Sequence, residues 1–289
     1  MPSPLGGGNA RPALEHLGAF LSGQALAHLQ AQGSEKAATE DHGFMPELIL
    51  SDITLMAPGY CVIGLESVGP DSFRSVRPLP PQRNAWRDPF AFKRGDYVRC
   101  QLRAAPDRPP HFEDRQSDGL RRTGGFLGEA DLVRCLKMAE VSIDLDGLFG
   151  CSLQSRTARG NCWVSPSTGC RSICGCVYGN IRFRVFEDPQ GLKLRAEMVL
   201  PSDESLSSLP VVDRDWNRFL QQVAERLGTV NIGSRSQKFL NGTIRNALLD
   251  SPNRFARIGL ARAQGDQCWL MLDSLFPQPT EDWLGALSQ

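Results

Sequence analysis

The sequence predicts a mainly β protein with interspersed helices (β+α), organised as small β-barrels. Short stretches of alternating or β-branched residues recur along most of the 289-residue chain, and turn residues separate them. Single helical patterns interrupt these stretches without alternating regularly with them. No glycine-rich fingerprint follows a strand, which argues against a dinucleotide-binding parallel sheet.

The length is that of about two domains. We predict an N-terminal appendage over 1–44, a first barrel over 45–125 and a second barrel with inserted helices over 126–289. In the appendage, leucines recur at helical spacing and predict one helix from about Pro12 to Gln30, while glycines and polar residues flank it.

Hydrophobic patterning places the elements of the first barrel. Strands are predicted over Leu48–Leu55, Tyr60–Leu65, Ser72–Val76 and Gly95–Leu102. The polar composition of 105–125 predicts a long loop.

The second barrel is predicted to begin with a helix over Glu129–Ala139, after which Val141–Leu148 reads as a strand. Residues 160–199 are predicted to form a β-meander, with turns at Gly179-Asn180 and at 188–191. Further predictions are a helix capped by Asp213 and ended by Gly228, a helix over Ser236–Leu249, and a strand pair over Ala256–Ala261 and Cys268–Leu272. After this pair, Trp283 is expected to pack back onto the protein.

Charge is balanced overall but unevenly distributed. The 32 basic residues match 32 acidic ones, and Arg outnumbers Lys, 27 to 5. Residues 71–122 and 156–195 each carry a net charge of +5, whereas 1–52 carries −4. Such stretches can present a positive face to an anionic partner, although a solvated surface of mixed charges would give the same uneven distribution along the sequence. No apolar run reaches membrane-spanning length and no signal peptide is apparent, so we expect a cytoplasmic protein without membrane contact.

Nine cysteines without a secretion signal do not predict a disulfide framework. Four of them, Cys162, Cys170, Cys174 and Cys176, lie close together in sequence and could bind zinc. Their spacing lacks the paired knuckles of zinc sites, so buried core cysteines are the favoured interpretation and no cofactor is predicted.

Catalytic residue sets are weak. Asp144 and Asp146 would share one face of a strand and could hold a divalent cation, but no further ligand completes the set. His111, in a proline-rich loop, lacks a nucleophile signature around it. We therefore predict no catalytic residues.

Basic residues interleaved with aromatic ones are more informative, because single-stranded nucleic acid binds to cations along its backbone and to aromatic rings under its bases. Alternation alone also places an arginine outside and an apolar residue in the core without any ligand. The candidate nucleic-acid contacts are Arg74, Arg77, Trp86, Arg87, Arg94, Arg182, Arg184 and Arg262.

Several segments together resemble the bacterial dual OB-containing domain family. They are Gly59–Leu65, Arg74–Leu79, Gly95–Val98, Pro109–Asp114 and Arg257–Arg262 followed by Cys268-Trp269-Leu270. The resemblance spans about 48–276 and implies two OB-like barrels that bind nucleic acid, in bacterial antiviral defence or mobile-element systems. It adds no catalytic residues; it supports Arg74, Arg77 and Arg262 as contacts. The appendage and the cysteine-rich strand depart from the family pattern.

The predicted function is thus non-enzymatic binding of nucleic acid, with single-stranded DNA or RNA favoured. One alternative is a protein–protein adaptor that docks a partner through 1–44 or the tail Phe276–Trp283. Another is a metal-dependent enzyme of nucleic acids that uses Asp144 and Asp146 or a zinc-bound cysteine cluster.

Overall fold

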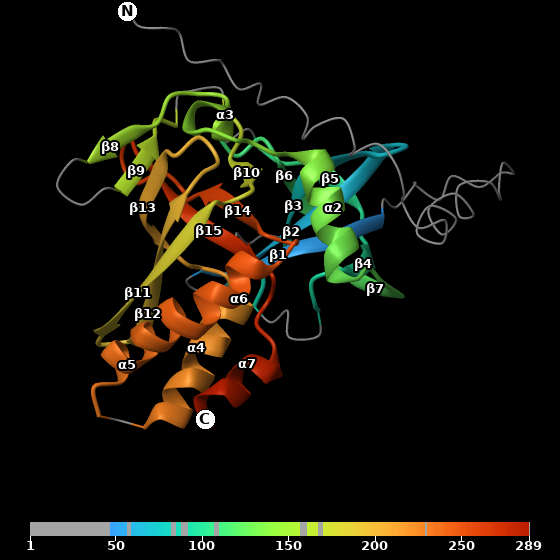
Figure 1. Cartoon of the computed structure of the whole chain (residues 1–289). Coiled ribbons are helices and arrows are strands. Elements are labelled where there is room, and N and C mark those ends of the chain that lie inside the picture. The colour runs from blue at the N-terminus through green and yellow to red at the C-terminus, as the bar shows by residue number, and fades with distance from the viewer. Residues whose placement is uncertain are drawn as a thin grey trace, which may run out of the picture. The chain divides into compact units, whose positions relative to one another are not determined.

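A computed structural model gives the fold of the chain (Figure 1). The chain divides into two compact units, Met1–Gly43 and Phe44–Gln289. The predicted appendage 1–44 and its helix lie outside the described residues. The structure describes residues 47–56, 59–81, 85–87, 92–106, 110–156, 161–166, 170–228 and 230–288.

The protein is mainly β, and its largest sheet curls into a half-barrel. Seven strands form this sheet in the order β5-β6-β3-β2-β1-β4-β7. The strands are β1 (Glu47–Met56), β2 (Gly59–Gly69), β3 (Ser72–Leu79), β4 (Asp96–Arg99), β5 (Leu102–Ala104), β6 (Asp114–Ser117) and β7 (Arg121–Phe126). All pairs are antiparallel except β3–β6. The predicted strands over 48–76 are confirmed, but 105–125 is not a loop because it holds β6 and most of β7.

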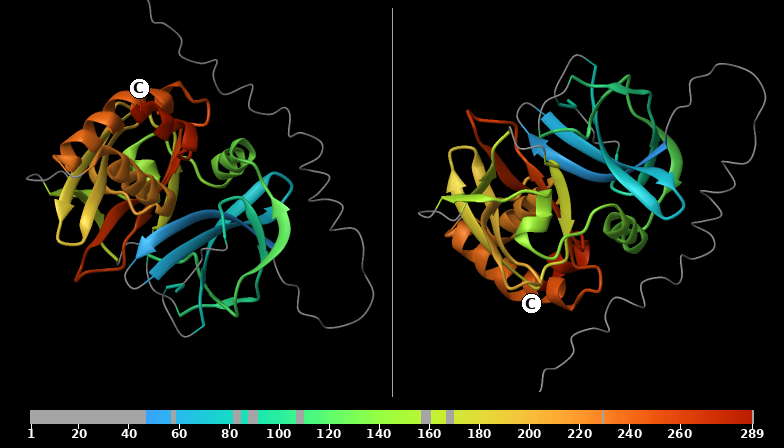
Figure 2. Two further views of the ribbon diagram at one scale, coloured as in Figure 1. Left: turned by 90° about the horizontal axis from the view of Figure 1, so that it is seen from below. Right: turned by 90° about the horizontal axis from the view of Figure 1, so that it is seen from above.

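Two smaller sheets follow in the chain. The five-stranded sheet has the order β10-β14-β15-β9-β8, and the three-stranded sheet has the order β11-β12-β13. Their strands are β8 (Gln154–Arg156), β9 (Asn161–Val164), β10 (Ile173–Cys176), β11 (Asn180–Asp188), β12 (Gly191–Val199), β13 (Ser205–Pro210), β14 (Phe255–Leu260) and β15 (Cys268–Phe276). Figure 2 shows β1 and β2, in blue, extending toward the part of the molecule that holds these sheets.

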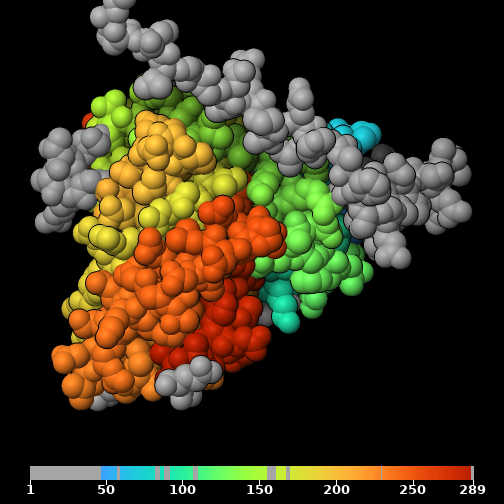
Figure 3. All heavy atoms as spheres, viewed as in Figure 1, coloured from blue at the N-terminus to red at the C-terminus, as the bar shows by residue number. Residues whose placement is uncertain are grey.

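The helices gather mostly after the third sheet. They are α2 (Glu129–Ala139), α3 (Leu145–Phe149), α4 (Arg214–Leu227), α5 (Ile232–Phe239), the π-helical turn η1 (Leu240–Ile244), α6 (Arg245–Asp250), α7 (Glu281–Gly285) and the 3₁₀ turn η2 (Ala286–Ser288). Helices α4–α6 run beside β11 and β12 in Figure 1, and residues 214–250 form the orange surface in Figure 3. The predicted helix over Glu129–Ala139 is confirmed as α2, while the one over Ser236–Leu249 is interrupted by η1.

Helix α4 shows how local sequence fixes an element. The Asp213 carboxylate accepts hydrogen bonds from the backbone N–H groups of Asp215 and Trp216, as an N-cap does. Gly228 follows the last helical residue at a φ of 75°, where a side chain would be strained. Both predicted ends of the helix are confirmed.

An aromatic cluster fixes α4 to the three-stranded sheet. Trp216 is fully buried and stacks on Phe183 of β11, with ring centroids 5.4 Å apart. Trp283 of α7 packs on Trp216 and Phe219 at centroid distances of 6.0 and 6.1 Å. Trp283 thus packs back as predicted, and its ring is partly buried against the core.

Two sequence interpretations are wrong, the first because of long-range strand pairing and the second because of a local helix cap. Residues 160–199 are not one meander, because β9 and β10 pair with β15 and β14 instead of with β11. Only the turn over 188–191 joins paired strands, β11 and β12. The predicted strand over Val141–Leu148 is also wrong, because its second half lies in the short helix α3, which begins where the Asp144 carboxylate accepts from the N–H of Gly147.

Candidate nucleic-acid interface

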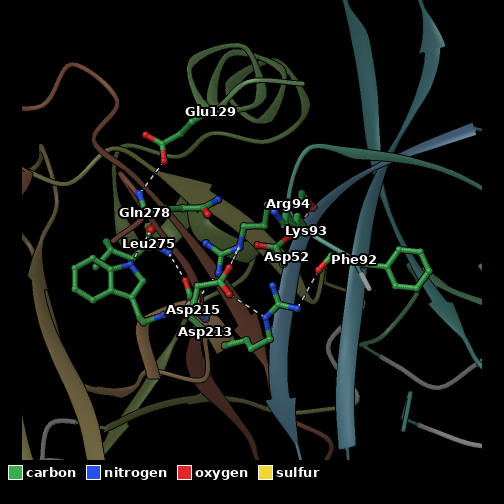
Figure 4. Close-up of polar contacts among 12 residues, drawn as sticks. Asp52, Phe92, Lys93, Arg94, Glu129, Asp213, Asp215, Leu275 and Gln278 are labelled. Atoms are coloured by element: carbon green, nitrogen blue, oxygen red, sulfur yellow. Dashed lines mark hydrogen bonds and ion pairs between the residues drawn. The ribbon is translucent and has the colours of Figure 1, made fainter. Parts of the chain in front are cut away.

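Two of the eight predicted contact residues are buried, and this corrects their assignment. The Arg77 guanidinium donates to Asp114 at 3.1 Å and to the His111 Nδ1 at 2.9 Å. Arg94 forms an ion pair with Asp213, and both side chains are fully buried (Figure 4). Because both guanidinium groups are buried and ion-paired, Arg77 and Arg94 hold the fold together and are not exposed contacts for a phosphate backbone.

The Arg94 ion pair belongs to a wider buried network. Arg214 donates to Asp215 and to the carbonyl of Phe92, so the segment before β4 is fastened to the start of α4 (Figure 4). The Leu275 N–H donates to the second oxygen of Asp213. Asp213 therefore joins β15, α4 and the Arg94 segment through one carboxylate.

Three other predicted residues have partners within the first sheet. Arg74 is exposed and pairs with Glu66 on the neighbouring strand at 2.6 Å. The Trp86 indole N–H donates to the carbonyl of Pro78 at 2.9 Å, which fixes the ring against β3. Arg262 is about one-third exposed and pairs with Asp114 at 2.8 Å.

Of the three remaining candidates, Arg182 and Arg184 lie on the outer face of β11, and Arg87 lies elsewhere. Exposure alternates along this strand, so that Ile181 and Phe183 face the core while the two arginines and Phe186 face outward. The register pairs these outward residues with residues of β12: Arg182 with Glu197, Arg184 with Arg195, and Phe186 with Lys193. We call this face of Arg182, Arg184, Phe186, Lys193 and Arg195 the hairpin face.

Two arginines stand directly opposite each other on the hairpin face. A like-charge cross-strand pair destabilises a sheet unless other groups compensate it. Arg184 reaches Glu197 at 3.3 Å, and Arg195 donates to the carbonyl of Ser208 at 2.6 Å. The Arg195 guanidinium also lies 5.7 Å from the centre of the Phe186 ring, a cation–π distance. Four cations here face two carboxylates, Glu197 and Asp188, so the face is net positive.

A groove of about 640 Å³ continues from the hairpin face. Its far wall contains Tyr60 and Arg87, which are held side by side because Tyr60 and Trp86 exchange backbone hydrogen bonds of 2.8 Å in each direction. Arg87 is exposed. The groove thus carries three cations, Arg87, Lys193 and Arg195, and two aromatic rings, Tyr60 and Phe186.

A smaller pocket of about 330 Å³ shares Leu55 and Met56 with the groove, since the end of β1 contributes to both walls. Arg77, His111, Arg262 and Asp273 also line this pocket. Burial and the two neighbouring guanidinium groups lower the pKa of His111 to about 2, so the ring is uncharged. Burial raises the pKa of the Asp273 carboxyl to about 7.

The four candidate zinc ligands do not converge. Cys174 and Cys176 are fully buried on β10, whereas Cys162 lies on β9. These strands are separated by β14 and β15, which at about 4.8 Å per strand places them about 14 Å apart. Within the described ranges, no group of three or more His, Cys, Asp or Glu side chains could hold a metal ion. The cysteines of β10 belong to the core, as the favoured interpretation had it.

One residue of the candidate acidic pair, Asp144, has a structural role. The Asp144 side chain caps α3 through the N–H of Gly147 at 2.7 Å, and Asp146 lies in the first turn of that helix. The two residues therefore do not share a strand face. This corrects the geometry on which the metal-dependent alternative depended.

Sequence reasoning missed Lys193, Arg195, Phe186 and Tyr60. The alternation of 192–198, with apolar residues at even positions and charged ones at 193, 195 and 197, could have identified the two cations of β12. The position of Tyr60 opposite them depends on contacts between distant segments and has no local signal.

Comparisons with family models, with curated proteins and with solved structures found no match to this chain. Among the described residues, no helix is long and apolar enough to cross a membrane.

Proposed function

We propose that the protein binds single-stranded nucleic acid, without catalysis, in the groove and on the hairpin face. The observation that carries the proposal is the arrangement of cations around the exposed ring of Phe186 and the partly exposed ring of Tyr60. Arg182, Arg184 and Lys193 would contact phosphates, and Phe186, which is 40% exposed, would stack on a base. The opposed arginines 184 and 195 support it further, since an anion between them would relieve their repulsion.

A single strand suits this site better than a duplex does. Base stacking on aromatic rings requires bases that are not already stacked on partners in a double helix. Tyr60 and Phe186 stand on two walls of one groove, so an unpaired strand could pass between them with its phosphates toward Arg87 and Lys193. Duplex binding would use the cations alone.

The architecture and setting are also part of the proposal. We infer that the curled seven-stranded sheet corresponds to one OB-like unit and that the later sheets derive from a second. OB folds commonly bind oligonucleotides, and the resemblance of the first segments to the dual OB-containing family points to bacterial defence or mobile-element systems. These assignments rest on that resemblance and on the mainly β fold.

The structure supports the adaptor alternative less than it supports nucleic-acid binding. Its C-terminal docking element is the tail Phe276–Trp283, whose Trp283 ring is packed on Trp216 and Phe219. Its N-terminal element, 1–44, lies outside the described residues. A stable protein partner combined with no nucleic-acid binding would favour the adaptor over our proposal.

Neutralising two cations of the hairpin face should weaken binding and reduce its salt dependence. Each lost phosphate contact on a single strand lowers the slope of log K against log salt by about 0.7, so Arg182→Gln with Lys193→Gln should lower it by about 1.4. Fluorescence anisotropy with a 15-residue oligothymidylate, from 50 to 300 mM salt, measures the slope. Phe186→Ala should instead reduce affinity with little change in slope, because stacking releases no counterions.

A matched control removes two exposed arginines from the opposite ends of the first sheet. Arg103 on β5 and Arg121 on β7 are both exposed, and neither lines the groove. Arg103→Gln with Arg121→Gln should leave the slope unchanged. If both double variants lower the slope equally, the strand is attracted non-specifically to the whole surface. If the unaltered protein does not bind at 50 mM salt, the proposed function is refuted.

A further inference from the structure

The small pocket beside the groove is lined by buried charged side chains, some of whose polar atoms have no hydrogen-bond partner within the fold. Arg77 and Asp273 are 5% and 3% exposed, and both line the pocket. The Nε of Arg77, the Nη1 of Arg262 and the Oδ1 of Asp273 are buried without a hydrogen-bond partner. Leaving such atoms unpaired costs free energy, and a ligand that supplies the missing partners would recover it.

The two guanidinium groups are held in place from behind. One oxygen of Asp114 accepts from Arg77 at 3.1 Å, and the other accepts from Arg262 at 2.8 Å. Asp114 is itself buried and is the acidic residue that positions both cations. The two guanidinium groups are therefore held in fixed positions beside the pocket.

Charge balance selects the class of ligand. With Asp273 ionised, two guanidinium groups face two carboxylates, Asp114 and Asp273, and His111 is uncharged. The pocket thus offers donors and an acceptor without a net charge. A phosphate or a metal ion would leave one sign of charge uncompensated, whereas an uncharged ligand with acceptors near one edge and donors near another would satisfy all three unpaired atoms.

We propose that this pocket takes an unstacked nucleobase from the strand in the groove and that it prefers guanine. Guanine presents the acceptors O6 and N7, which arginine recognises, next to the donors N1–H and N2–H, which a carboxylate can accept together. The volume of about 330 Å³ suits one base, and Leu260 and Met271 supply apolar walls. The inference rests on the proposed function because the base belongs to the strand bound in the groove. It would enter past Leu55 and Met56, which line both cavities.

The test compares oligothymidylate 15-mers that differ only at the central base, at pH 8. A single guanine should tighten binding by about fivefold or more, with adenine and cytosine closer to thymine. Hypoxanthine, which lacks the N2 amino group, and 7-deazaguanine, which lacks N7, should each lose part of this gain. Asp273→Asn should abolish the preference for guanine while leaving the affinity for oligothymidylate unchanged, and the exposed control Asp266→Asn should retain both.

The outcomes separate this inference from the proposed function. Equal affinity for all central bases, with oligothymidylate bound, overturns the guanine pocket and leaves the function standing. A guanine preference that survives in Asp273→Asn also overturns it. If neither oligonucleotide binds but free guanosine shifts the NMR signals of Met56 and Met271 methyl groups in the unaltered protein alone, the pocket stands and the strand-binding function falls.

Discussion

Asp213→Ala should lower the free energy of unfolding by about 4 kcal/mol or more. The substitution removes the N-cap of α4, which is worth about 1 kcal/mol. It also leaves the fully buried Arg94 without its main partner, and breaking a buried ion pair from one side costs about 3–5 kcal/mol. Urea denaturation of the wild-type and variant proteins measures the difference.

Two further variants separate the cap from the charge. Asp213→Asn keeps an oxygen that can accept from the Asp215 and Trp216 N–H groups but removes the negative charge. Arg94→Met with Asp213→Asn removes both charges and should cost less than the sum of the single substitutions, because no buried charge remains unpaired. A loss of only about 1 kcal/mol in Asp213→Ala, the worth of an ordinary cap, would contradict an energetic role for the ion pair.

A surface ion pair provides the reference. Asp131 and Arg134 of α2 lie 2.9 Å apart with side chains 32% and 39% exposed. Because water screens such a pair, Asp131→Ala should change stability by less than about 1 kcal/mol. The contrast with Asp213 would attribute the larger effect to burial.

Features set by neighbouring residues could be predicted from the sequence. The bounds of α2, the two ends of α4 and the turn over 188–191 each follow from residues within one element. Caps and turns are local because their hydrogen bonds join residues two to four apart. The assignment of β9 and β10 failed because strand partners lie up to about a hundred residues away.

The same distinction explains which site residues were predicted. Arg182 and Arg184 were identified from alternation in one strand, and the structure places them outward on the hairpin face. Arg94 and Arg77 look like solvated cations in sequence, yet their acidic partners are 119 and 37 residues away. Whether an arginine is buried depends on such distant carboxylates, and local composition does not reveal them.

Asp273→Asn should remove the pH dependence that this carboxyl imposes on stability. Burial raises the pKa of Asp273 from 3.8 to about 7. Asp52 and Asp213 contribute to this rise in the pKa, whereas Arg77 and Arg257 oppose it. Between these two pH values the folded protein binds a proton that the unfolded chain does not, so the free energy of unfolding falls as pH rises.

Each pH unit costs about 1.4 kcal/mol, so ionising Asp273 removes about 4 kcal/mol of stability between pH 4 and pH 8. The asparagine side chain carries no charge to desolvate, so the variant should be more stable than the wild-type protein by about that amount at pH 8 and similar to it at pH 4. Urea denaturation at both pH values gives the difference, with Asp266→Asn as an exposed control. Parallel wild-type and variant profiles would mean that Asp273 ionises in the folded protein as easily as in the unfolded chain. In that case the position of Asp273 in the smaller pocket would not lower the free energy of unfolding.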